Sequence, residues 1–95
     1  MKIQKSIENA KLTIVPVGRL DHITAPALET ELVLDGIDEL VVDFSGVDYL
    51  SSAGLRVLLA AQKRMVGKKM VIAHARPMVK EVFDITGFSD IFTLV

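Results

Sequence analysis

The sequence predicts a small α/β domain whose mixed sheet is mostly parallel and carries an antiparallel hairpin at one edge. Three observations lead to this fold class. Two short strand patterns joined by a turn open the chain. Strand and helix patterns then alternate to the end, as in units with right-handed crossovers. The 95 residues are 51% apolar, enough for one small core, so we expect a single domain over residues 1–95 with the element order β-β-α-β-α-β-α-β.

An N-terminal hairpin is predicted from two apolar segments. A weak strand around Ile3 and Ile7 is followed by the turn residues 9–10 and by a stronger strand pattern over residues 12–17. Pro16 cannot donate a hydrogen bond to a neighbouring strand, so we expect an irregular or edge-like end of the second strand there.

A short first helix follows a loop. After Gly18, residues 19–23 are predicted to form that loop, which leads to Thr24, a good N-cap residue. Pro26 is tolerated in the first turn because the N–H groups there have no intrahelical acceptor. We expect the helix to reach about Leu34.

A buried strand and a second helix form the centre of the chain. Residues 40–44 are almost continuously apolar, which is typical of a strand buried in a parallel sheet, and residues 45–48 are predicted to turn out of it. The second helix is expected to begin at the pair of serines at 51–52 and to run to about Val66, where Gly67 ends it.

The last part of the chain repeats the alternation of strand and helix. Residues 69–73 form an apolar strand pattern, Pro77 starts a third helix that Gly87 closes, and residues 91–95 predict a terminal strand. One face of the third helix carries Val79, Val82, Phe83 and Thr86, and its apolar members are assigned to the core.

Composition excludes several classes of function. The 11 basic and 12 acidic residues nearly cancel, and the basic residues form only one short group, so we expect no nucleic-acid partner. The absence of cysteine removes thiolate nucleophiles and thiolate metal sites. With no apolar signal core and no run of membrane-spanning length, we expect a cytoplasmic protein without membrane insertion. The basic group consists of Lys63, Arg64, Lys68 and Lys69.

The histidines do not predict a metal site. The chain has two of them, and no acidic residue stands at metal-ligand spacing from either, so we expect no metal. His74 ends an apolar strand and is interpreted as a partly buried structural residue. No phosphate-binding glycine motif is present, so no cofactor is expected.

The junction between the central strand and the second helix is the most informative segment. Two adjacent hydroxyls, Ser51 and Ser52, stand where a strand ends and a helix begins, and the first turn of a helix favours anions. The junction is therefore a candidate phosphate site. As an alternative, Ser52 is an ordinary N-cap, worth roughly 1 kcal/mol. Gly54 is interpreted as a packing residue, because a side chain there would crowd the neighbouring strand ends.

Nearly the whole chain resembles the STAS domain of bacterial anti-sigma factor antagonists. The resemblance rests on the order of elements, on residues 18–21 (GRLD) and on residues 43–55 (DFSGVDYLSSAGL). It implies a small STAS fold in which a serine at the start of the helix after the third strand is phosphorylated by an anti-sigma factor that is also a protein kinase. The family's Gly-Leu pair matches residues 54–55, which places the acceptor at Ser52. Ser51 stands where the family usually has an acidic residue, and it is a rival acceptor.

The resemblance also implies partners. The unmodified domain is expected to capture an anti-sigma factor and the phosphorylated domain to release it, after which a serine phosphatase restores it. ATP and Mg²⁺ would come with the kinase, and the free domain is expected to be a monomer. Arg56, one turn after Ser52, leans toward the helix start and could reach a phosphate there. The expected partner-binding residues are Asp21, His22, Thr24, Ser51, Ser52, Ala53, Gly54 and Arg56, although local turn chemistry is the alternative for Asp21 and His22.

Ser52 does not have the surroundings of an enzyme nucleophile. Its neighbours lack the Gly-x-Ser-x-Gly spacing, and a small core leaves little room for a pocket, so we predict a kinase substrate and not an enzyme. Two alternatives remain open. The chain could be an unphosphorylated scaffold or the cytoplasmic accessory subunit of a transporter, or it could be a weak nucleotide- or metabolite-binding module.

Overall fold

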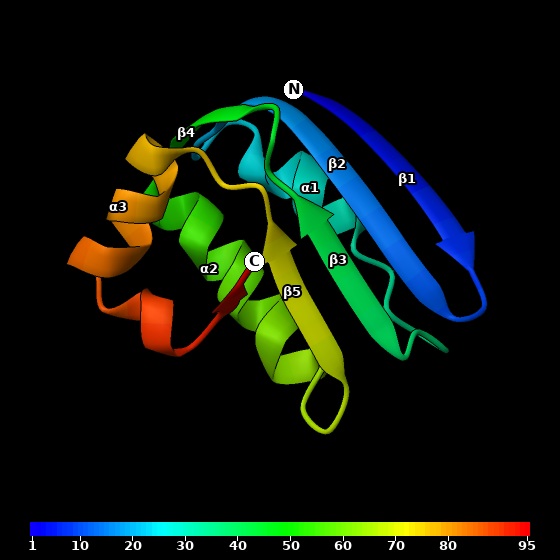
Figure 1. Ribbon diagram of the computed structural model, residues 1–95. Coiled ribbons are helices and arrows are strands. Elements are labelled where there is room, and N and C mark those ends of the chain that lie inside the picture. Colours follow the sequence, from blue (N-terminus) through cyan, green and yellow to red (C-terminus); the bar gives the residue numbers. More distant parts are fainter.

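The computed structural model describes residues 1–95 and contains six strands and three α-helices (Figure 1). In chain order the elements are β1 (Lys2–Glu8), β2 (Lys11–Leu20), α1 (Ala25–Glu31), β3 (Glu39–Asp43), β4 (Val47–Leu50), α2 (Ser52–Arg64), β5 (Lys69–Ala73), α3 (Pro77–Ile85), the 3₁₀ helix η1 (Phe88–Asp90) and β6 (Thr93–Leu94). The sheet order is β1-β2-β3-β5-β6, and β4 pairs with β2 outside this row. Because β1 is antiparallel to β2 and every other pairing is parallel, the predicted fold class is confirmed.

The hairpin between β1 and β2 forms as predicted. Glu8 and Lys11 face each other at its end, and the two residues between them, Asn9 and Ala10, have φ angles of 52° and 63°. Two successive residues with positive φ give a turn whose twist matches that of the paired strands. β1 therefore lies at the edge of the sheet, where most of its side chains are exposed.

β2 is longer than predicted, and Pro16 does not end it. The strand continues to Leu20 and changes its parallel neighbour on the way, pairing with β3 over residues 11–14 and with β4 over residues 18–20. Pro16 lies in the interval between these two partners. Because proline has no N–H group to donate, an interval without a parallel partner accommodates it and the strand runs on.

The predicted order of elements lacks β4 and η1. The turn expected at residues 45–48 is present at its start, where the Val47 N–H donates to the Phe44 carbonyl at 3.0 Å, but the chain then pairs with the end of β2. A strand of four residues whose two middle side chains are exposed has no recognisable sequence pattern. β4 exists because β2 runs on past Pro16 and offers it a partner.

α1 is shorter than predicted. It ends at Glu31, before the expected Leu34, although Leu32 and Leu34 after it are still buried. Leu32 and Ile37 fill the core from an irregular segment. A helical spacing of apolar residues predicts burial correctly here, but it does not distinguish a helix from a loop that packs against the same core.

The C-terminal half agrees more closely with the prediction. β5 has the expected bounds, α3 starts at Pro77, and Gly67 and Gly87 follow α2 and α3 with φ angles of 78° each. The expected terminal strand over residues 91–95 is reduced to β6, because η1 and the turn after it bring the chain back to β5 only at Thr93.

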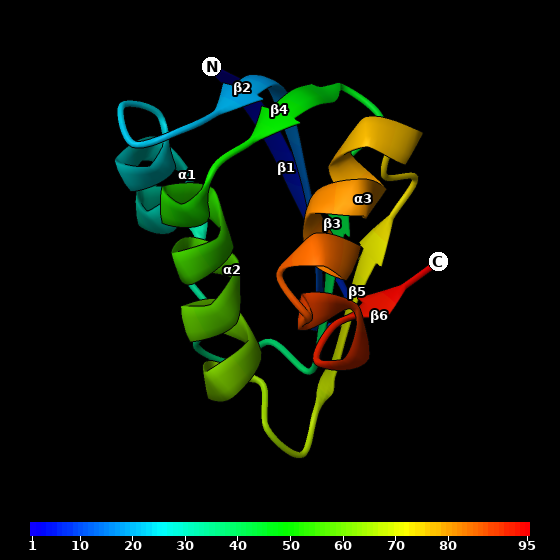
Figure 2. The ribbon, with the colours of Figure 1, turned by 90° about the vertical axis from the view of Figure 1, so that its left-hand side faces the viewer.

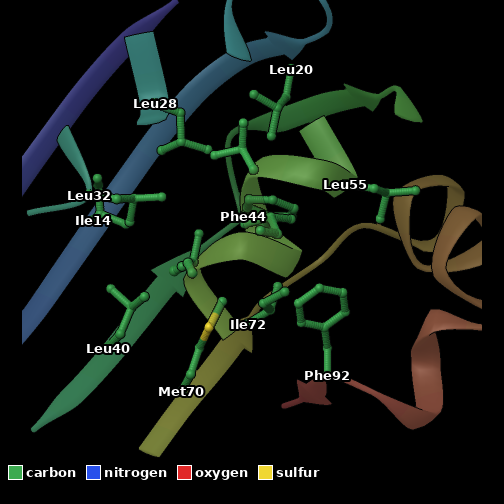
Figure 3. Close-up of a cluster of buried hydrophobic side chains, with 14 of the residues drawn as sticks. Ile14, Leu20, Leu28, Leu32, Leu40, Phe44, Leu55, Met70, Ile72 and Phe92 are labelled. Atoms are coloured by element: carbon green, nitrogen blue, oxygen red, sulfur yellow. The ribbon is translucent and has the colours of Figure 1, made fainter. Parts of the chain in front are cut away.

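The core lies between the helices and one face of the sheet. Figures 1 and 2 show α1 and α2 on that face, with α3 beside the edge formed by β5 and β6. Alternate residues of the strands point into this layer, and Figure 3 shows several of them meeting the helices. The fully buried or nearly buried members on β3 and β5 are Leu40, Val42, Met70 and Ile72.

The buried face of α3 is largely the predicted one. Val79 and Phe83 are buried and Val82 packs at the rim of the core. The Phe83 ring meets the Phe92 ring edge-on, with 5.5 Å between centroids. Thr86 is exposed and follows the end of the helix, where its hydroxyl donates to the Val82 carbonyl at 2.6 Å. The aromatic contact ties α3 to the last segment of the chain.

Candidate functional site

The two serines at the start of α2 have different surroundings. Ser51 is the N-cap: its backbone is extended, with φ −99° and ψ 173°, and its Oγ accepts a hydrogen bond from the Gly54 N–H at 3.4 Å. Ser52 is the first residue of the helix. The capping role considered for Ser52 therefore belongs to Ser51, because β4 ends at Leu50 and places Ser51 at the point where the chain leaves the strand.

Ser52 has the more accessible hydroxyl. The residue is exposed and its Oγ makes no hydrogen bond to the protein, whereas Ser51 is half-buried and its Oγ serves the cap. The first turn of a helix also has N–H groups without intrahelical acceptors and carries the positive end of the helix dipole. An anion attached to Ser52 would lie at that end of α2.

Gly54 allows the start of α2 to press against the ends of two strands. A Cβ atom at this position would lie 2.7 Å from Cγ of Leu20 and 2.8 Å from Cδ1 of Leu50. Real side chains do not approach this closely, so a larger residue would push α2 away from β2 and β4. The geometry supports the packing role expected for this glycine.

The segment between β2 and α1 is closed by its own side chains. The Asp21 Oδ1 accepts hydrogen bonds from the N–H groups of Ile23 (3.0 Å) and Thr24 (3.1 Å). The Thr24 hydroxyl accepts from the Asp21 N–H at 2.9 Å and donates to the Arg19 carbonyl at 2.6 Å. Thr24 occupies the predicted N-cap position, but its side chain makes no cap hydrogen bond, because it closes this loop.

These hydrogen bonds stabilise the ionised form of Asp21. The Thr24 N–H is the largest cause that holds the pKa of Asp21 below its usual range. Partial desolvation opposes it, while the Ile23 N–H, the Thr24 hydroxyl and the Arg19 guanidinium add to the lowering. The local turn chemistry considered for Asp21 is therefore present, and it leaves Oδ2 of the same carboxylate outside these hydrogen bonds.

The fold brings this loop to the start of α2. The Ser51 N–H donates to the Leu20 carbonyl at 2.9 Å, which joins the end of β2 to the end of β4. Figure 2 shows the two connections, β2 to α1 and β4 to α2, next to each other at one end of the molecule. The segment that contains Asp21 and Thr24 therefore lies next to the segment that contains Ser51 and Ser52.

Arg19 and Tyr49 belong to the same surface and were missed by the sequence analysis. They face each other in the β2–β4 register, and the Arg19 guanidinium carbon lies 4.1 Å from the centroid of the Tyr49 ring. The Arg19 Nε is also 3.6 Å from the Asp21 Oδ2. Thirty residues separate Arg19 from Tyr49 in the chain, so no local pattern could have paired them before β4 was known.

The remaining predicted site residues have few contacts. His22 and Arg56 are exposed, and neither side chain makes a hydrogen bond or an ion pair within the protein. Arg56 does follow Ser52 by one helical turn, as expected. Ala53 packs at the rim of the core, between the exposed Ser52 and the buried Gly54.

His74 differs from its predicted environment. Its side chain is 69% exposed, its φ angle is 60°, and its Nδ1 lies 3.4 Å from the Asp43 Oδ1. The expectation of partial burial is wrong, because β5 ends at Ala73 and the chain turns outward there. Burial acts to raise the pKa of Asp43, but hydrogen bonds from Ser45 and His74 outweigh it and hold that pKa below its usual range.

Other surface features lie away from this site. Arg64 and Lys68 of the basic group donate to the carbonyl oxygens of Leu32 and Ile37, so they hold the segment after α1. A polar depression lies beside the β1–β2 turn, at the opposite end of the sheet from Ser52. None of the helices combines the length and the apolar character needed to cross a bilayer.

Comparison with known proteins identifies the family. The sequence model of the STAS domain matches residues 1–95. The chain is 42% identical to BtrV, a proposed anti-sigma factor antagonist of Bordetella bronchiseptica, over 79% of this chain and 69% of BtrV. It is 33% identical to the anti-sigma-B factor antagonist of Listeria monocytogenes, over 95% of this chain and 83% of that protein.

Solved structures show the same fold. The unphosphorylated form of the anti-sigma factor antagonist SpoIIAA matches with a TM-score of 0.83 and 16% identity, over 99% of this chain and 88% of SpoIIAA. The phosphorylated form of SpoIIAA, from Bacillus, matches with a TM-score of 0.75 and 15% identity, over 99% and 91% of the two chains. From the fold and the matches in sequence together, this chain belongs to the STAS domain family, among the anti-sigma factor antagonists.

Proposed function

We propose that this chain is an antagonist of an anti-sigma factor and that phosphorylation of Ser52 controls it. In the unmodified state it binds the anti-sigma factor in the cytoplasm, and once Ser52 is phosphorylated it releases this partner. The anti-sigma factor is itself the kinase, and a serine phosphatase restores the hydroxyl. The observation that carries the proposal is the exposed, unbonded Ser52 hydroxyl at the start of α2, on the same surface as the Asp21 loop.

The similar proteins support the class of partner and the kind of control. BtrV and the Listeria protein are named for antagonism of anti-sigma factors, so an anti-sigma factor is the expected partner. SpoIIAA, which shares the fold, exists in unphosphorylated and phosphorylated forms. Anti-sigma factor antagonists are regulators and not enzymes, so ATP and Mg²⁺ come with the partner.

The chemical step is a phosphoryl transfer onto this chain. The Ser52 Oγ attacks the γ-phosphorus of ATP bound to the kinase, the new Oγ–P bond forms as the bond to the β-phosphate oxygen breaks, and ADP leaves. The hydroxyl proton passes to a base on the kinase. A phosphatase reverses the modification by hydrolysis, which yields serine and inorganic phosphate.

The switch follows from where the new charge lies. Phosphorylation adds between about 1.5 and 2 negative charges and three acceptor oxygens at pH 7. The first turn of α2 tolerates them, so the fold of the free protein need not change. In a complex, the same charge and bulk would have to be desolvated against the partner, and this cost expels the partner.

Ser51 is the competing acceptor, and its role as a cap weighs against it. A phosphate on Ser51 would take the Oγ from its hydrogen bond to the Gly54 N–H. The half-buried Ser51 hydroxyl would have to leave this hydrogen bond to enter the active site of a kinase, whereas the exposed Ser52 hydroxyl makes none. Ser52 is therefore the favoured acceptor of the two.

The test is phosphorylation by the cognate anti-sigma factor. Purified chain, kinase and Mg-ATP are incubated, and intact mass is measured for the natural chain, Ser52→Ala and the matched control Ser51→Ala. We expect one phosphate on the natural chain and on Ser51→Ala, and none on Ser52→Ala. A phosphate that persists on Ser52→Ala would move the site to another residue. A stable complex without any phosphate transfer would favour the scaffold function.

A further inference from the structure

We propose that Arg19 is the residue that binds the phosphate on Ser52, and that it leaves Asp21 to do so. This inference rests on the proposed function, because it assumes a phosphorylated Ser52. It goes further because it assigns the phosphate a binding residue, Arg19 on β2. It also predicts that the docking surface, the partner-binding surface around Ser52 and Asp21, changes its arrangement as well as its charge.

The first observation is that the Arg19 guanidinium is held in place but makes no hydrogen bond. It lies over the Tyr49 ring at 4.1 Å, a cation–π contact that restricts where the charged group can be. Its Nε is 3.6 Å from the Asp21 Oδ2, which is beyond hydrogen-bond distance. The side chain is 61% exposed. All its N–H donors are thus available to a stronger acceptor on this surface.

The second observation is that β2 and β4 bring Arg19 to the start of α2. Arg19 pairs with Tyr49 and Leu20 with Leu50, and the Ser51 N–H then donates to the Leu20 carbonyl. The guanidinium lies over Tyr49, three residues before Ser52, and near Asp21, the first residue after β2. A phosphate on Ser52 would therefore form at the same end of β2 and β4 as the Arg19 cation.

The third observation is the asymmetry of the Asp21 carboxylate. Its Oδ1 is held by the N–H groups of Ile23 and Thr24, and these bonds keep the loop closed without Arg19. Only Oδ2 faces the guanidinium. A phosphate with up to two charges and three oxygens can bind a guanidinium with two parallel hydrogen bonds, which the present Asp21 contact does not provide. The exchange is therefore favourable and leaves the loop intact.

The consequence is a docking surface with two distinct states. In the unmodified chain, Arg19 covers part of Tyr49 and partly neutralises Asp21. In the phosphorylated chain, Arg19 is paired with phosphate, the Asp21 Oδ2 is without its counterion, and the face of Tyr49 is uncovered. A partner that fits the first arrangement then meets three changes: the phosphate itself, an Asp21 carboxylate without its counterion, and an uncovered Tyr49 ring.

Arg56 is the competing receptor and the matched control. It is also an exposed arginine without a partner, and it lies one turn after Ser52 on the same helix. Unlike Arg19, it has no aromatic ring or carboxylate that holds its guanidinium in one place. Holding its long side chain in one position would cost more conformational entropy.

The experiment uses chain with phosphoserine incorporated at position 52 during synthesis, so that no kinase is needed. Phosphorus NMR titration gives the second pKa of the phosphate in this protein and in its Arg19→Gln and Arg56→Gln variants. We expect Arg19→Gln to raise that pKa by about one unit, because removing a nearby cation disfavours the dianion, and Arg56→Gln to leave it unchanged. Arg19→Lys, which keeps the charge but not the planar fork, should fall in between.

Two further signals distinguish a moved arginine from a general electrostatic effect. The Arg19 Nε–H resonance should shift on phosphorylation as the group leaves the ring current of Tyr49. Tyr49 is the single tyrosine and there is no tryptophan, so intrinsic fluorescence also reports this contact. An unchanged Arg19 resonance, or a pKa that responds to Arg56→Gln and not to Arg19→Gln, would overturn the proposal. Neither result depends on whether phosphorylation releases the anti-sigma factor, which binding experiments test separately.

Discussion

Ser51 and Ser52 differ in what their hydroxyl groups contact, and this difference decides which substitutions inform on function. Removing the Ser51 hydroxyl leaves the Gly54 N–H without its acceptor and weakens the start of α2. Removing the Ser52 hydroxyl breaks no hydrogen bond in the free protein. Substitutions at Ser52 should therefore change the interaction with the partner and the kinase while leaving the stability of the free protein almost unchanged.

Replacement of Ser52 by aspartate should weaken binding to the anti-sigma factor by about tenfold or more. The variant places one negative charge where the phosphate would lie, and an unpaired charge desolvated in an interface costs several kcal/mol. Ser52→Ala should bind like the natural chain and should not be released by Mg-ATP. Isothermal titration calorimetry measures both. Equal affinity of Ser52→Asp and the natural chain would show that Ser52 lies outside the interface.

Gly54→Ala should lower the free energy of unfolding by about 1–3 kcal/mol. Alanine is the better helix former by about 1 kcal/mol, but its Cβ would meet Leu20 and Leu50 at under 3 Å, and overpacking of this kind outweighs the gain. Urea denaturation measures the difference. The double variant Gly54→Ala with Leu20→Ala should lose less stability than the sum of the two single changes. Gly54→Ala as stable as the natural chain would mean that the leucines move aside at little cost.

At the scale of elements, the loop between β2 and α1 is a small structure fastened by side chains. Asp21 and Thr24 satisfy each other's backbone groups, and the Ser51 N–H ties the end of β2 to the start of α2. Neither α1 nor α2 needs a partner protein to be placed in this arrangement. The docking surface is thus formed before binding, which lowers the entropy cost of association.

The dependence of the free energy of unfolding on acid pH should show the contribution of the hydrogen bonds to Asp21 in this loop. The pKa of Asp21 is lowered in the folded protein, so its ionised form stabilises the fold at pH values above about 3.9, the pKa in the unfolded chain. That stabilisation is lost as the pH falls through the lower, folded-state value. Urea midpoints measured across this range should fall less steeply for Asp21→Asn than for the natural chain.

Asp35→Asn is the control for this prediction, because Asp35 is exposed and makes no hydrogen bond or ion pair. Asp43, whose pKa is also lowered, should contribute in the same direction as Asp21. An acid dependence identical in Asp21→Asn and the natural chain would show that the hydrogen bonds from Ile23 and Thr24 do not favour the ionised carboxylate.

At the scale of the whole molecule, one core joins the sheet to all three helices. Buried residues from the strands, from α1 and α2, and from α3 form a single connected cluster of 23 side chains. Because the core is continuous, we expect the protein to unfold in one cooperative transition, with the same midpoint for circular dichroism and Tyr49 fluorescence. Two separated midpoints would show that α3 unfolds on its own.

Phe83→Ala should remove much of the stability. The side chain is fully buried and lies between the rings of Phe44 and Phe92, and Phe→Ala changes in cores cost about 3–5 kcal/mol. A protein of this size is stable by about 5–15 kcal/mol. Ile85→Ala on the same helix is the control: Ile85 is 75% exposed, so the change should cost within about 0.5 kcal/mol. Similar urea midpoints for the two variants would contradict this assignment of the core.

The alternation of strands and helices was predictable from the sequence because it depends on local patterns. The apolar run before residue 44, the strand over residues 69–73 and the turn at residues 9–10 each have a signal within a few neighbouring residues. The packing role of Gly54 was predicted from its place in the first turn of a helix that follows a strand end, where a side chain would crowd the neighbouring strand ends. The family resemblance, which also rests on contiguous residues, is confirmed.

Other features depend on contacts between segments that are distant in the chain. β4 forms only because β2 continues past Pro16, and β4 in turn makes Ser51 the cap and leaves the Ser52 hydroxyl exposed. The same pairing places Arg19 over Tyr49, thirty residues away. No sequence pattern carries this information, because strand pairing is a long-range interaction that depends on the whole sheet. The sequence by itself determined the fold class and the pair of candidate serines, and the tertiary structure decided how those serines and their charged neighbours are arranged.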